Sequence, residues 1–317
     1  MNQEFKKVNS TIAQVIQRAE NMSKNYKKFN QPDHLQDYKC KDCNDSGFIF
    51  EKVNEKTLSG KNNRRDVYRP CSCAEKKHRN NRFKNSLIPN EFQDARFDNY
   101  EQKSNVQRVL FKATQDYLRA IPKIINERPK NNSLGFLAVF GESHFKSLNM
   151  EERLQAKSDH NNFGIGKTHL QIAAAKWIMN NIRIPIEKVN EDDPIRTRGC
   201  NVLCISDVSY IDELISLKMS NDGGSDFLKS LNNAINADVL VWDDFAKSKY
   251  SEAKQNLYYR IIDERYRHRR PILFNSNEDI STLNEKIGYA ASSRLIGMCR
   301  DRVYHVEGED YRLFNRN

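Results

Sequence analysis

The sequence predicts an α/β fold in three layers, with a parallel sheet between helices, preceded by a small metal-binding domain. Two observations predict the larger part: apolar strand-like runs alternate with amphipathic helices from about residue 104 onward, and a Gly-Lys-Thr motif joins one such strand to a helix. Strands that alternate with helices form parallel sheets covered by helices. The third observation is a pair of close cysteine clusters before this region, which predicts the smaller domain.

The Gly-Lys-Thr motif lies in GIGKTHL, residues 164–170, and follows the apolar run LGFLAVF at 134–140. A phosphate-binding loop needs glycines so that backbone N–H groups can close around the phosphates. It also needs a lysine that reaches the β- and γ-phosphates and a Ser or Thr hydroxyl for Mg²⁺. The sequence therefore predicts a site for ATP and Mg²⁺. Its candidate nucleotide-binding residues are Gly141, Gly164, Ile165, Gly166, Lys167, Thr168 and His169.

The phosphate-binding loop is predicted to be interrupted. The full pattern G-x-x-x-x-G-K-[ST] requires glycine at position 161, where the chain has Asn161. Gly141 is then the glycine that begins the loop, and residues 144–163 are an insertion within it. Because this segment is mostly polar, we expect it to lie on the surface.

Two acidic residues follow the apolar stretch VLVW at 239–242, namely Asp243 and Asp244. In this interpretation Asp243 holds Mg²⁺ through water and Asp244 polarises the attacking water. A later strand, residues 271–274, ends in Asn275-Ser276-Asn277, where an amide could orient that water. An ordinary strand-to-turn signal is the alternative for this polar end.

The paired cysteines Cys40, Cys43, Cys71 and Cys73 form a C-x₂-C knuckle and a C-x-C pair about 27 residues apart. Four thiolates in two tight turns suit tetrahedral Zn²⁺, which would hold together a domain too small for its own core. His78 is a possible substitute ligand. The alternative is that the four cysteines are buried or incidental. The residues between the pairs, 45–69, predict a hairpin.

Composition bounds the remaining possibilities. The 317 residues are 38% hydrophobic and 30% charged, with a net charge of +10. No run suits a membrane helix or a signal peptide, so we expect a cytoplasmic protein without a membrane partner. Residues 61–84 carry nine Lys or Arg against Asp66 and Glu75, which favours a polyanion such as nucleic acid over a merely solvated face.

The expected organisation is a zinc-binding domain at 1–85, a linker at 86–103 and an ATPase domain at 104–317. Residues 2–28 predict a helix with one apolar stripe, which either packs on its own domain or docks on a partner. The polar, proline-interrupted segment 181–199 predicts a loop.

Taken in order, these motifs resemble the DnaC/DnaI type of AAA+ helicase loader, a family close to the IstB transposition helpers. The resemblance covers nearly the whole chain from about residue 36. It is carried by the cysteine pattern, Ile88-Pro89 with Phe92 and Ala95-Arg96-Phe97, GIGKTHL, VLVWDD, IIDERY before PILFNSN, and Ser293-Arg294-Leu295 with Tyr311-Arg312.

The resemblance implies roles for particular residues. Lys167 and Thr168 would belong to Walker A, and Asp243 and Asp244 to Walker B. Asn277 would be sensor I, Arg294 the catalytic arginine finger from a neighbouring subunit, and Arg312 sensor II.

The resemblance also implies an N-terminal zinc domain that grips a replicative DnaB-type helicase, and an ATPase domain that self-associates and touches single-stranded DNA. Assembly would be a homo-oligomer or would be templated by the helicase. The expected function is ATP-controlled loading of that helicase onto single-stranded DNA in replication initiation or restart. Hydrolysis is expected to be slow, since Asp244 stands where general AAA+ proteins more commonly have Glu. The alternatives are a transposase-helper ATPase and an adaptor that does not hydrolyse ATP.

Overall fold

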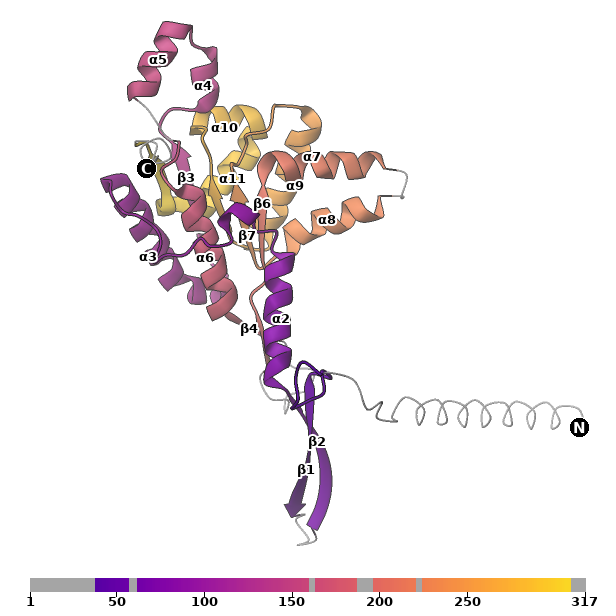
Figure 1. Ribbon diagram of the computed structural model, residues 1–317. Coiled ribbons are helices and arrows are strands. Elements are labelled where there is room, and N and C mark those ends of the chain that lie inside the picture. The colour runs from indigo at the N-terminus through magenta and orange to yellow at the C-terminus, as the bar shows by residue number, and fades with distance from the viewer. Residues whose placement is uncertain (1–37, 57–61, 160–162, 187–195, 221–223, 309–317) are drawn as a thin grey trace, which may run out of the picture. The chain divides into compact units, whose positions relative to one another are not determined.

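The computed structural model describes residues 38–56, 62–159, 163–186, 196–220 and 224–308 (Figure 1). The chain divides into two compact units, residues 1–75 and 76–317. The helix expected within 2–28 and the sensor candidate Arg312 lie outside the described residues.

The first unit contains the expected hairpin. Strand β1 (Phe48–Lys56) pairs antiparallel with β2 (Asn62–Pro70), with Phe50 opposite Tyr68. At its base the Cys71 N–H donates to the Gly47 carbonyl over 2.9 Å, which closes the strands beside the cysteines. Helix α2 (Ser72–Asn85) begins in this unit and continues into the second.

The second unit is built on a five-stranded sheet in the order β6-β7-β8-β3-β9, in which every pair is parallel. The strands are β3 (Leu134–Ala138), β6 (Val202–Ser206), β7 (Val239–Asp243), β8 (Ile272–Asn275) and β9 (Val303–Val306). Counted along the chain, β3 is the first strand of this sheet, β8 the fourth and β9 the fifth. The first strand therefore lies between the fourth and the fifth. All the carboxyl ends meet at one edge, where polar residues that follow different strands can converge.

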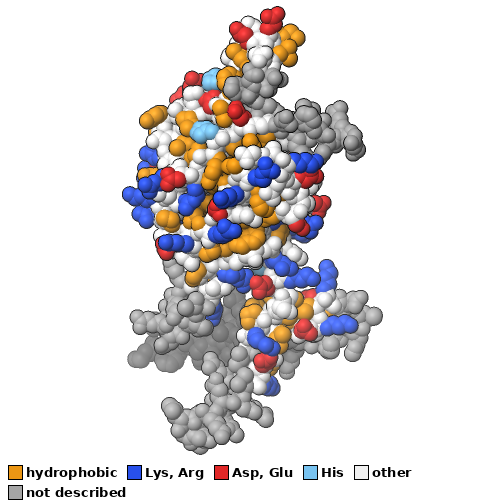
Figure 2. All heavy atoms as spheres, turned by 90° about the vertical axis from the view of Figure 1, so that its left-hand side faces the viewer, with side chains coloured by type: hydrophobic (Ala, Val, Ile, Leu, Met, Phe, Trp, Pro, Cys, Tyr) orange, Lys and Arg blue, Asp and Glu red, His pale blue; other side chains and the backbone are white. Residues whose placement is uncertain are grey.

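Helices α3 (Asn105–Glu127) and α6 (Lys167–Asn181) cover one face of the sheet. Helix α3 begins at a capping box, in which Ser104 and Gln107 satisfy each other's backbone N–H groups. It continues through Pro122 to Glu127. The side of the molecule shown in Figure 2 presents a band of hydrophobic side chains with Lys and Arg scattered around it.

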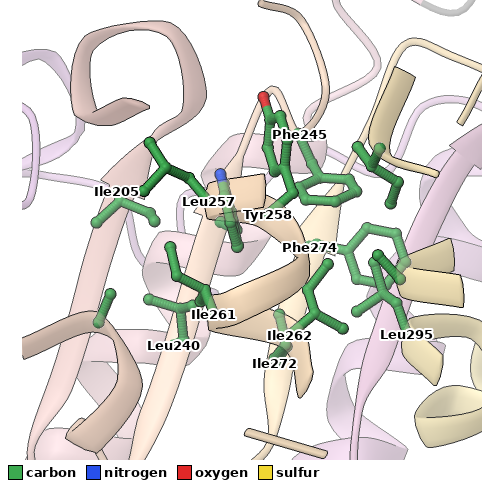
Figure 3. Packing of buried hydrophobic residues seen from close by; sticks show 14 of the residues in the cluster. Ile205, Leu240, Phe245, Leu257, Tyr258, Ile261, Ile262, Ile272, Phe274 and Leu295 are labelled. Carbon is green, nitrogen blue, oxygen red and sulfur yellow. The ribbon is translucent and has the colours of Figure 1, made fainter. Parts of the chain in front are cut away.

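The opposite face of the sheet is covered by the helices that follow β6, β7 and β8. They are α7 (Asp207–Met219), α8 (Ser225–Asn236), α9 (Glu252–Arg267), α10 (Ile280–Ile287) and α11 (Tyr289–Cys299). Figure 3 shows Leu257, Tyr258, Ile261 and Ile262 of α9 packed over strand residues such as Leu240.

The two cores divide the strand side chains by alternation. Leu240 and Trp242 of β7 belong to the core under α9, whereas Val239 and Val241 belong to the core under α3 and α6. Successive side chains of a strand point to opposite faces, so a strand buried on both sides must be apolar at nearly every position. The expected three-layer α/β fold is confirmed.

One segment differs from the sequence-based expectation. A two-stranded antiparallel sheet, β4 (Arg183–Ile186) with β5 (Arg196–Gly199), lies within the region predicted as a loop. Proline and charge are tolerated there because both strands are short and largely exposed. Helix α4 (Glu142–Ser147) leads into the interruption of the phosphate-binding loop, and α5 (Met150–Asp159) lies within it.

Short 3₁₀ turns occur at η1 (Asn90–Phe92) and η2 (Arg300–Arg302). In the part of the chain that the structure describes, no helix is both long and apolar enough to span a bilayer.

Candidate functional site

The second half of the phosphate-binding loop turns from residue 163 into α6. Gly164 and Gly166 have φ of 65° and 86°, a backbone conformation that glycine adopts without strain. A Cβ on Gly166 would also lie 2.6 Å from Cε2 of Tyr100, so the close approach of that ring requires glycine as well. Helix α6 begins at Lys167, which places Lys167 and Thr168 in its first turn.

The structure brings Walker A and Walker B candidates into direct contact. Thr168 Oγ1 lies 2.7 Å from Asp243 Oδ1, at the carboxyl end of β7. Lys167 Nζ donates to Asn277 Oδ1 over 2.7 Å, just beyond the end of β8. These four residues come from three segments of the chain, and parallel strands bring them to the same edge of the sheet.

Asn275 completes the contacts of Asp243, a role that sequence reasoning did not give it. Its Nδ2 donates to Asp243 Oδ1 over 2.6 Å and to Gln171 Oε1 over 2.9 Å, while its own Oδ1 accepts from the Asp244 N–H. The only feature of the sequence that pointed to Asn275 was an amide side chain at the end of a strand, two residues before Asn277. Asn275 therefore fixes the orientation of the Asp243 carboxylate.

Burial raises the pKa of Asp243, opposed by hydrogen bonds from Asn275 and Thr168. A carboxylate that is costly to ionise in its own site gains from a nearby cation. A carboxylate oxygen beside a threonine hydroxyl suits Mg²⁺, which prefers oxygen ligands. The donor set at Thr168 and Asp243 therefore fits Mg²⁺.

Asp244 has a left-handed backbone, with φ of 50°. Its Oδ2 lies 2.6 Å from Lys247 Nζ, and its Oδ1 accepts from Asn277 Nδ2 at 3.3 Å. The predicted catalytic residues Asp244 and Asn277 thus lie within hydrogen-bonding distance of each other. The contact from Lys247 was not expected from the sequence.

The first half of the interrupted loop is bound by carboxylates. The Gly141 N–H donates to Asp279 Oδ2, and the Ser143 N–H donates to Glu278 Oε2, both over 2.9 Å. A Cβ on Gly141 would lie 2.5 Å from Asp279 Oδ2, so any other residue there would displace that carboxylate. His144 Nδ1 also lies 2.9 Å from Asp279. Acidic side chains therefore bind backbone N–H groups of the kind that phosphate oxygens would contact.

A cleft of about 170 Å³ opens beside the second half of the loop. Its lining includes Phe92, Asn99, Tyr100, Gly164, Gly166 and His169. Tyr100 donates its hydroxyl to the carbonyl of buried Ile165 over 3.1 Å, and its ring centroid lies 5.5 Å from that of His169. The aromatic surfaces and amide suit a planar heterocycle such as adenine. Tyr100 was not among the expected site residues.

Arg294 lies on α11 and forms an ion pair with α9. Its Nε lies 2.9 Å from Asp263 Oδ1, and its guanidinium lies over the rings of Tyr259 and Tyr266. The side chain is 30% exposed. Its Nη1 also donates to the Ala290 carbonyl over 2.9 Å, within the same helix.

In the first unit, the sulfur atoms of Cys40, Cys43, Cys71 and Cys73 all lie within 4.8 Å of one another. The Cys43–Cys73 and Cys40–Cys71 separations are 3.2 and 3.7 Å. Thiolates at about 2.3 Å from a tetrahedral zinc lie about 3.8 Å apart. The four cysteines therefore fit Zn²⁺, and among the described residues His78 is not part of this group.

The fold and the site together define the class of domain. A parallel sheet in which the first strand lies between the fourth and fifth has its phosphate-binding loop after the first strand and its acidic pair after the third. This is the arrangement of a P-loop nucleotide-binding fold.

Comparisons with known proteins return relatives of the kind that the motifs resemble. No protein-family model matches the chain. The phage-like element PBSX protein XkdC of Bacillus subtilis (strain 168) is 23% identical over 289 residues, or 88% of this chain and 86% of that protein. The crystal structure of the DnaC helicase loader is 19% identical, with a TM-score of 0.48, and covers 69% of this chain and 100% of its own. That of DnaI is 15% identical, with a TM-score of 0.46, over 71% and 94%. The chain is thus similar to DnaC and to DnaI, the two loaders that its motifs resemble.

Proposed function

We propose that this protein is an ATP-dependent loader of a replicative, DnaB-type helicase onto single-stranded DNA, acting in replication initiation or restart. The observation that carries the proposal is the contact of Thr168 with Asp243, together with that of Lys167 with Asn277. It brings the lysine and hydroxyl of a phosphate-binding loop to a carboxylate and an amide on two other strands. A loop lysine for the phosphates, and a loop hydroxyl beside a strand-end carboxylate for Mg²⁺, are the groups with which P-loop proteins bind a nucleoside triphosphate.

The residues divide the work of binding as follows. Backbone N–H groups of 164–168 surround the phosphates, and Lys167 exchanges its bond to Asn277 for the β- and γ-phosphates. Thr168 and Asp243 hold Mg²⁺, which when bound neutralises phosphate charge. Asn275 keeps the Asp243 carboxylate aimed at that position. Tyr100 and His169 flank the space for the base.

Hydrolysis needs a group that orients water at the γ-phosphate. Asp244 and Asn277 are the candidates, since they contact each other beside Lys167. Asp244 must first leave Lys247, whose ammonium neutralises the carboxylate over 2.6 Å. This contact, and the need for Arg294 from a neighbouring subunit, would make turnover slow and dependent on assembly.

The zinc unit is proposed to bind the helicase. Four cysteines close the base of a hairpin that has only two strands, and two strands alone are marginally stable in water. Zinc therefore supplies the rigidity that the unit needs to present a defined surface. Phe48, Phe50 and Tyr68 lie exposed on the hairpin and are suited to contact a protein partner.

A second candidate is a helicase adaptor that does not hydrolyse ATP, and the binding of Asp279 and Glu278 to the first half of the loop favours it. Equilibrium binding of a fluorescent ATP analogue separates the two: the loader binds it in a Mg²⁺-dependent manner, and the adaptor does not. A transposase-helper ATPase is the third candidate.

The deciding experiment mixes the full chain with a replicative helicase, ATP and a forked DNA whose strands are coated with single-strand-binding protein. A loader forms a stable complex with the helicase and stimulates unwinding only with ATP. A transposase helper does neither, although it binds ATP.

A further inference from the structure

Three turns at the amino-terminal edge of the sheet each contain an arginine with positive φ. Arg128 (φ 48°) follows α3 and precedes β3, Arg269 (φ 51°) lies between α9 and β8, and Arg300 (φ 51°) lies between α11 and β9. Strands β8, β3 and β9 are neighbours in that order. The turns that enter three adjacent strands therefore meet at the end of the sheet opposite the nucleotide site.

Hydrogen bonds join the three turns into one surface. Arg269 Nη1 donates to the Arg128 carbonyl over 3.2 Å, and Arg302 Nη1 donates to the Asn131 carbonyl over 3.1 Å. The Ser133 N–H donates to the Met298 carbonyl over 3.0 Å. The backbone positions of the three turns relative to one another are thus fixed by the fold.

The surface is strongly basic. It presents the cations Arg128, Lys130, Arg269, Arg270, Arg300 and Arg302, all exposed or partly exposed. Burial lowers the pKa of Arg270 and the charge of Arg128 lowers it further, against the raising effect of Asp238 and Glu264.

Few carboxylates neutralise this basic surface. The exposed Asp301 lies 3.7 Å from Arg300. Glu264 faces His268, and Asp238 forms a bidentate pair with Arg198. The excess of positive charge is therefore available to a partner.

The backbone at these turns favours glycine over arginine. A positive φ is strained for a residue with a Cβ, and glycine is the usual residue just after a helix. Arg300, with φ of 51° and ψ of −111°, is in a region that side chains rarely adopt. Glycine would adopt all three conformations with less strain, whereas the three arginines place guanidinium groups at this edge of the sheet.

We infer that this surface, named here the arginine edge, binds the phosphodiester backbone of nucleic acid at a site separate from the nucleotide site. Guanidinium groups bind phosphate oxygens in a bidentate manner and remain charged at any physiological pH. A row of them across three strand ends, spaced by about 4.8 Å per strand, suits a linear polyanion. The inference does not depend on ATP, helicase or the proposed loading activity.

The test replaces Arg128, Arg269 and Arg300 by glycine in the full chain and measures binding to fluorescent single-stranded and duplex oligonucleotides by anisotropy, without ATP. Because glycine fits all three backbone conformations, we expect a melting temperature equal to or above that of the wild type. Affinity should fall about tenfold or more, and the slope of log K against log salt concentration should become shallower by about 2 for single strands. The two oligonucleotides show which form is preferred.

The matched control removes the same charge elsewhere, with Arg108→Gln, Lys112→Gln and Lys123→Gln on the exposed face of α3. Its affinity should change less than about threefold. A third variant with lysine at positions 128, 269 and 300 keeps the charge and should retain most of the binding. Equal losses in the glycine variant and the α3 control would overturn the inference, because net charge alone would then explain binding. If the glycine triple variant melts below the wild type, Arg300→Gly alone and Lys130→Gln must still weaken binding; unchanged binding in both would overturn the inference as well.

Discussion

Lys167 and Asn277 are 110 residues apart in the chain, yet Lys167 Nζ lies 2.7 Å from Asn277 Oδ1. The bond joins the first turn of α6 to the segment after β8, and Lys167 is otherwise buried. An ammonium group beside a neutral amide can change partners at small cost when phosphate arrives, since charge-assisted hydrogen bonds are the stronger ones.

The first prediction concerns this lysine. Lys167→Ala should weaken ATP binding by roughly 10- to 100-fold, because a hydrogen bond to a charged group contributes about 1.5–3 kcal/mol. Equilibrium titration with a fluorescent ATP analogue measures the loss. Lys218→Ala, on the exposed surface of α7, is the matched control and should bind normally. Helicase binding by the zinc unit should persist in Lys167→Ala, and its disappearance would show that the two units do not divide the work as proposed.

The second prediction concerns zinc. Freshly purified protein should contain one Zn²⁺ per chain by elemental mass spectrometry, and Cys43→Ser should lose it. His78→Ala should retain zinc, because the four sulfur atoms already fit a tetrahedral site without the imidazole. Chelation should release the hairpin from its base and abolish helicase binding without affecting ATP binding. Protein without zinc would refute the site, whereas loss only in His78→Ala would require a different set of ligands.

The third prediction concerns the interruption of the phosphate-binding loop. Deleting residues 144–163 joins Ser143 to Gly164 and restores an unbroken loop, so ATP binding should survive or tighten. The deletion also removes His144, whose Nδ1 lies 2.9 Å from the same Asp279 oxygen that accepts from the Gly141 N–H. A variant in which 148–159 is replaced by a glycine-serine linker of equal length controls for loop length. Loss of binding with an intact circular dichroism spectrum would mean that the insertion is part of the site.

The fourth prediction concerns Asp207, which is buried at the start of α7. It accepts hydrogen bonds from Trp242 Nε1 at 3.0 Å, the Ser248 N–H at 3.0 Å and the Tyr258 hydroxyl at 2.7 Å. Asp207→Ala leaves three buried donors without this partner and should cost about 2–5 kcal/mol in free energy of unfolding. Urea denaturation measures the change. Asp212→Ala, an exposed acid on the same helix, should cost less than about 1 kcal/mol.

The pH dependence of that cost has a definite sign. Burial raises the pKa of Asp207 above its ordinary value of 3.8 in the folded protein, against the lowering effect of the Tyr258 bond. The folded state therefore holds the proton more tightly, and the contribution of Asp207 to stability is lost as pH rises from 3.8 through the folded pKa. The destabilisation caused by Asp207→Ala should be larger at about pH 5 than at about pH 7.5. An equal cost at both values, or a larger one at the higher pH, would contradict the raised pKa.

Much of the fold and part of the site could be predicted from the sequence. The apolar strands and the parallel β/α alternation predict that GIGKT, VLVWDD and NSN meet at one edge, and they do. The role of Asn275 could not be predicted from the sequence, because Asn277 is an equally good candidate there. Only the structure shows that Asn275 contacts Asp243.

Tyr100 and the pair Glu278 and Asp279 were missed for a related reason. Their contacts with the loop join segments far apart in sequence, and no periodic pattern encodes such pairs. The strands β4 and β5 were missed because exposed short strands need no apolar alternation.

The last prediction concerns Arg294, which pairs with Asp263 across α9 and α11. If it completes the active site of a neighbouring subunit, Arg294→Ala should bind ATP normally but lose hydrolysis by roughly 10³-fold or more, together with ATP-dependent assembly on DNA. Arg267→Ala is the matched control, since Arg267 also contacts Asp263, at 2.8 Å, and its loss should leave turnover nearly unchanged. Mixing Arg294→Ala with Lys167→Ala should partly restore activity, because each chain supplies what the other lacks across one interface. An isolated surface ion pair contributes no more than about 1 kcal/mol to stability and nothing to turnover. Hydrolysis by Arg294→Ala at the wild-type rate would therefore assign it that structural role and make Arg300 or Arg302 the next candidate.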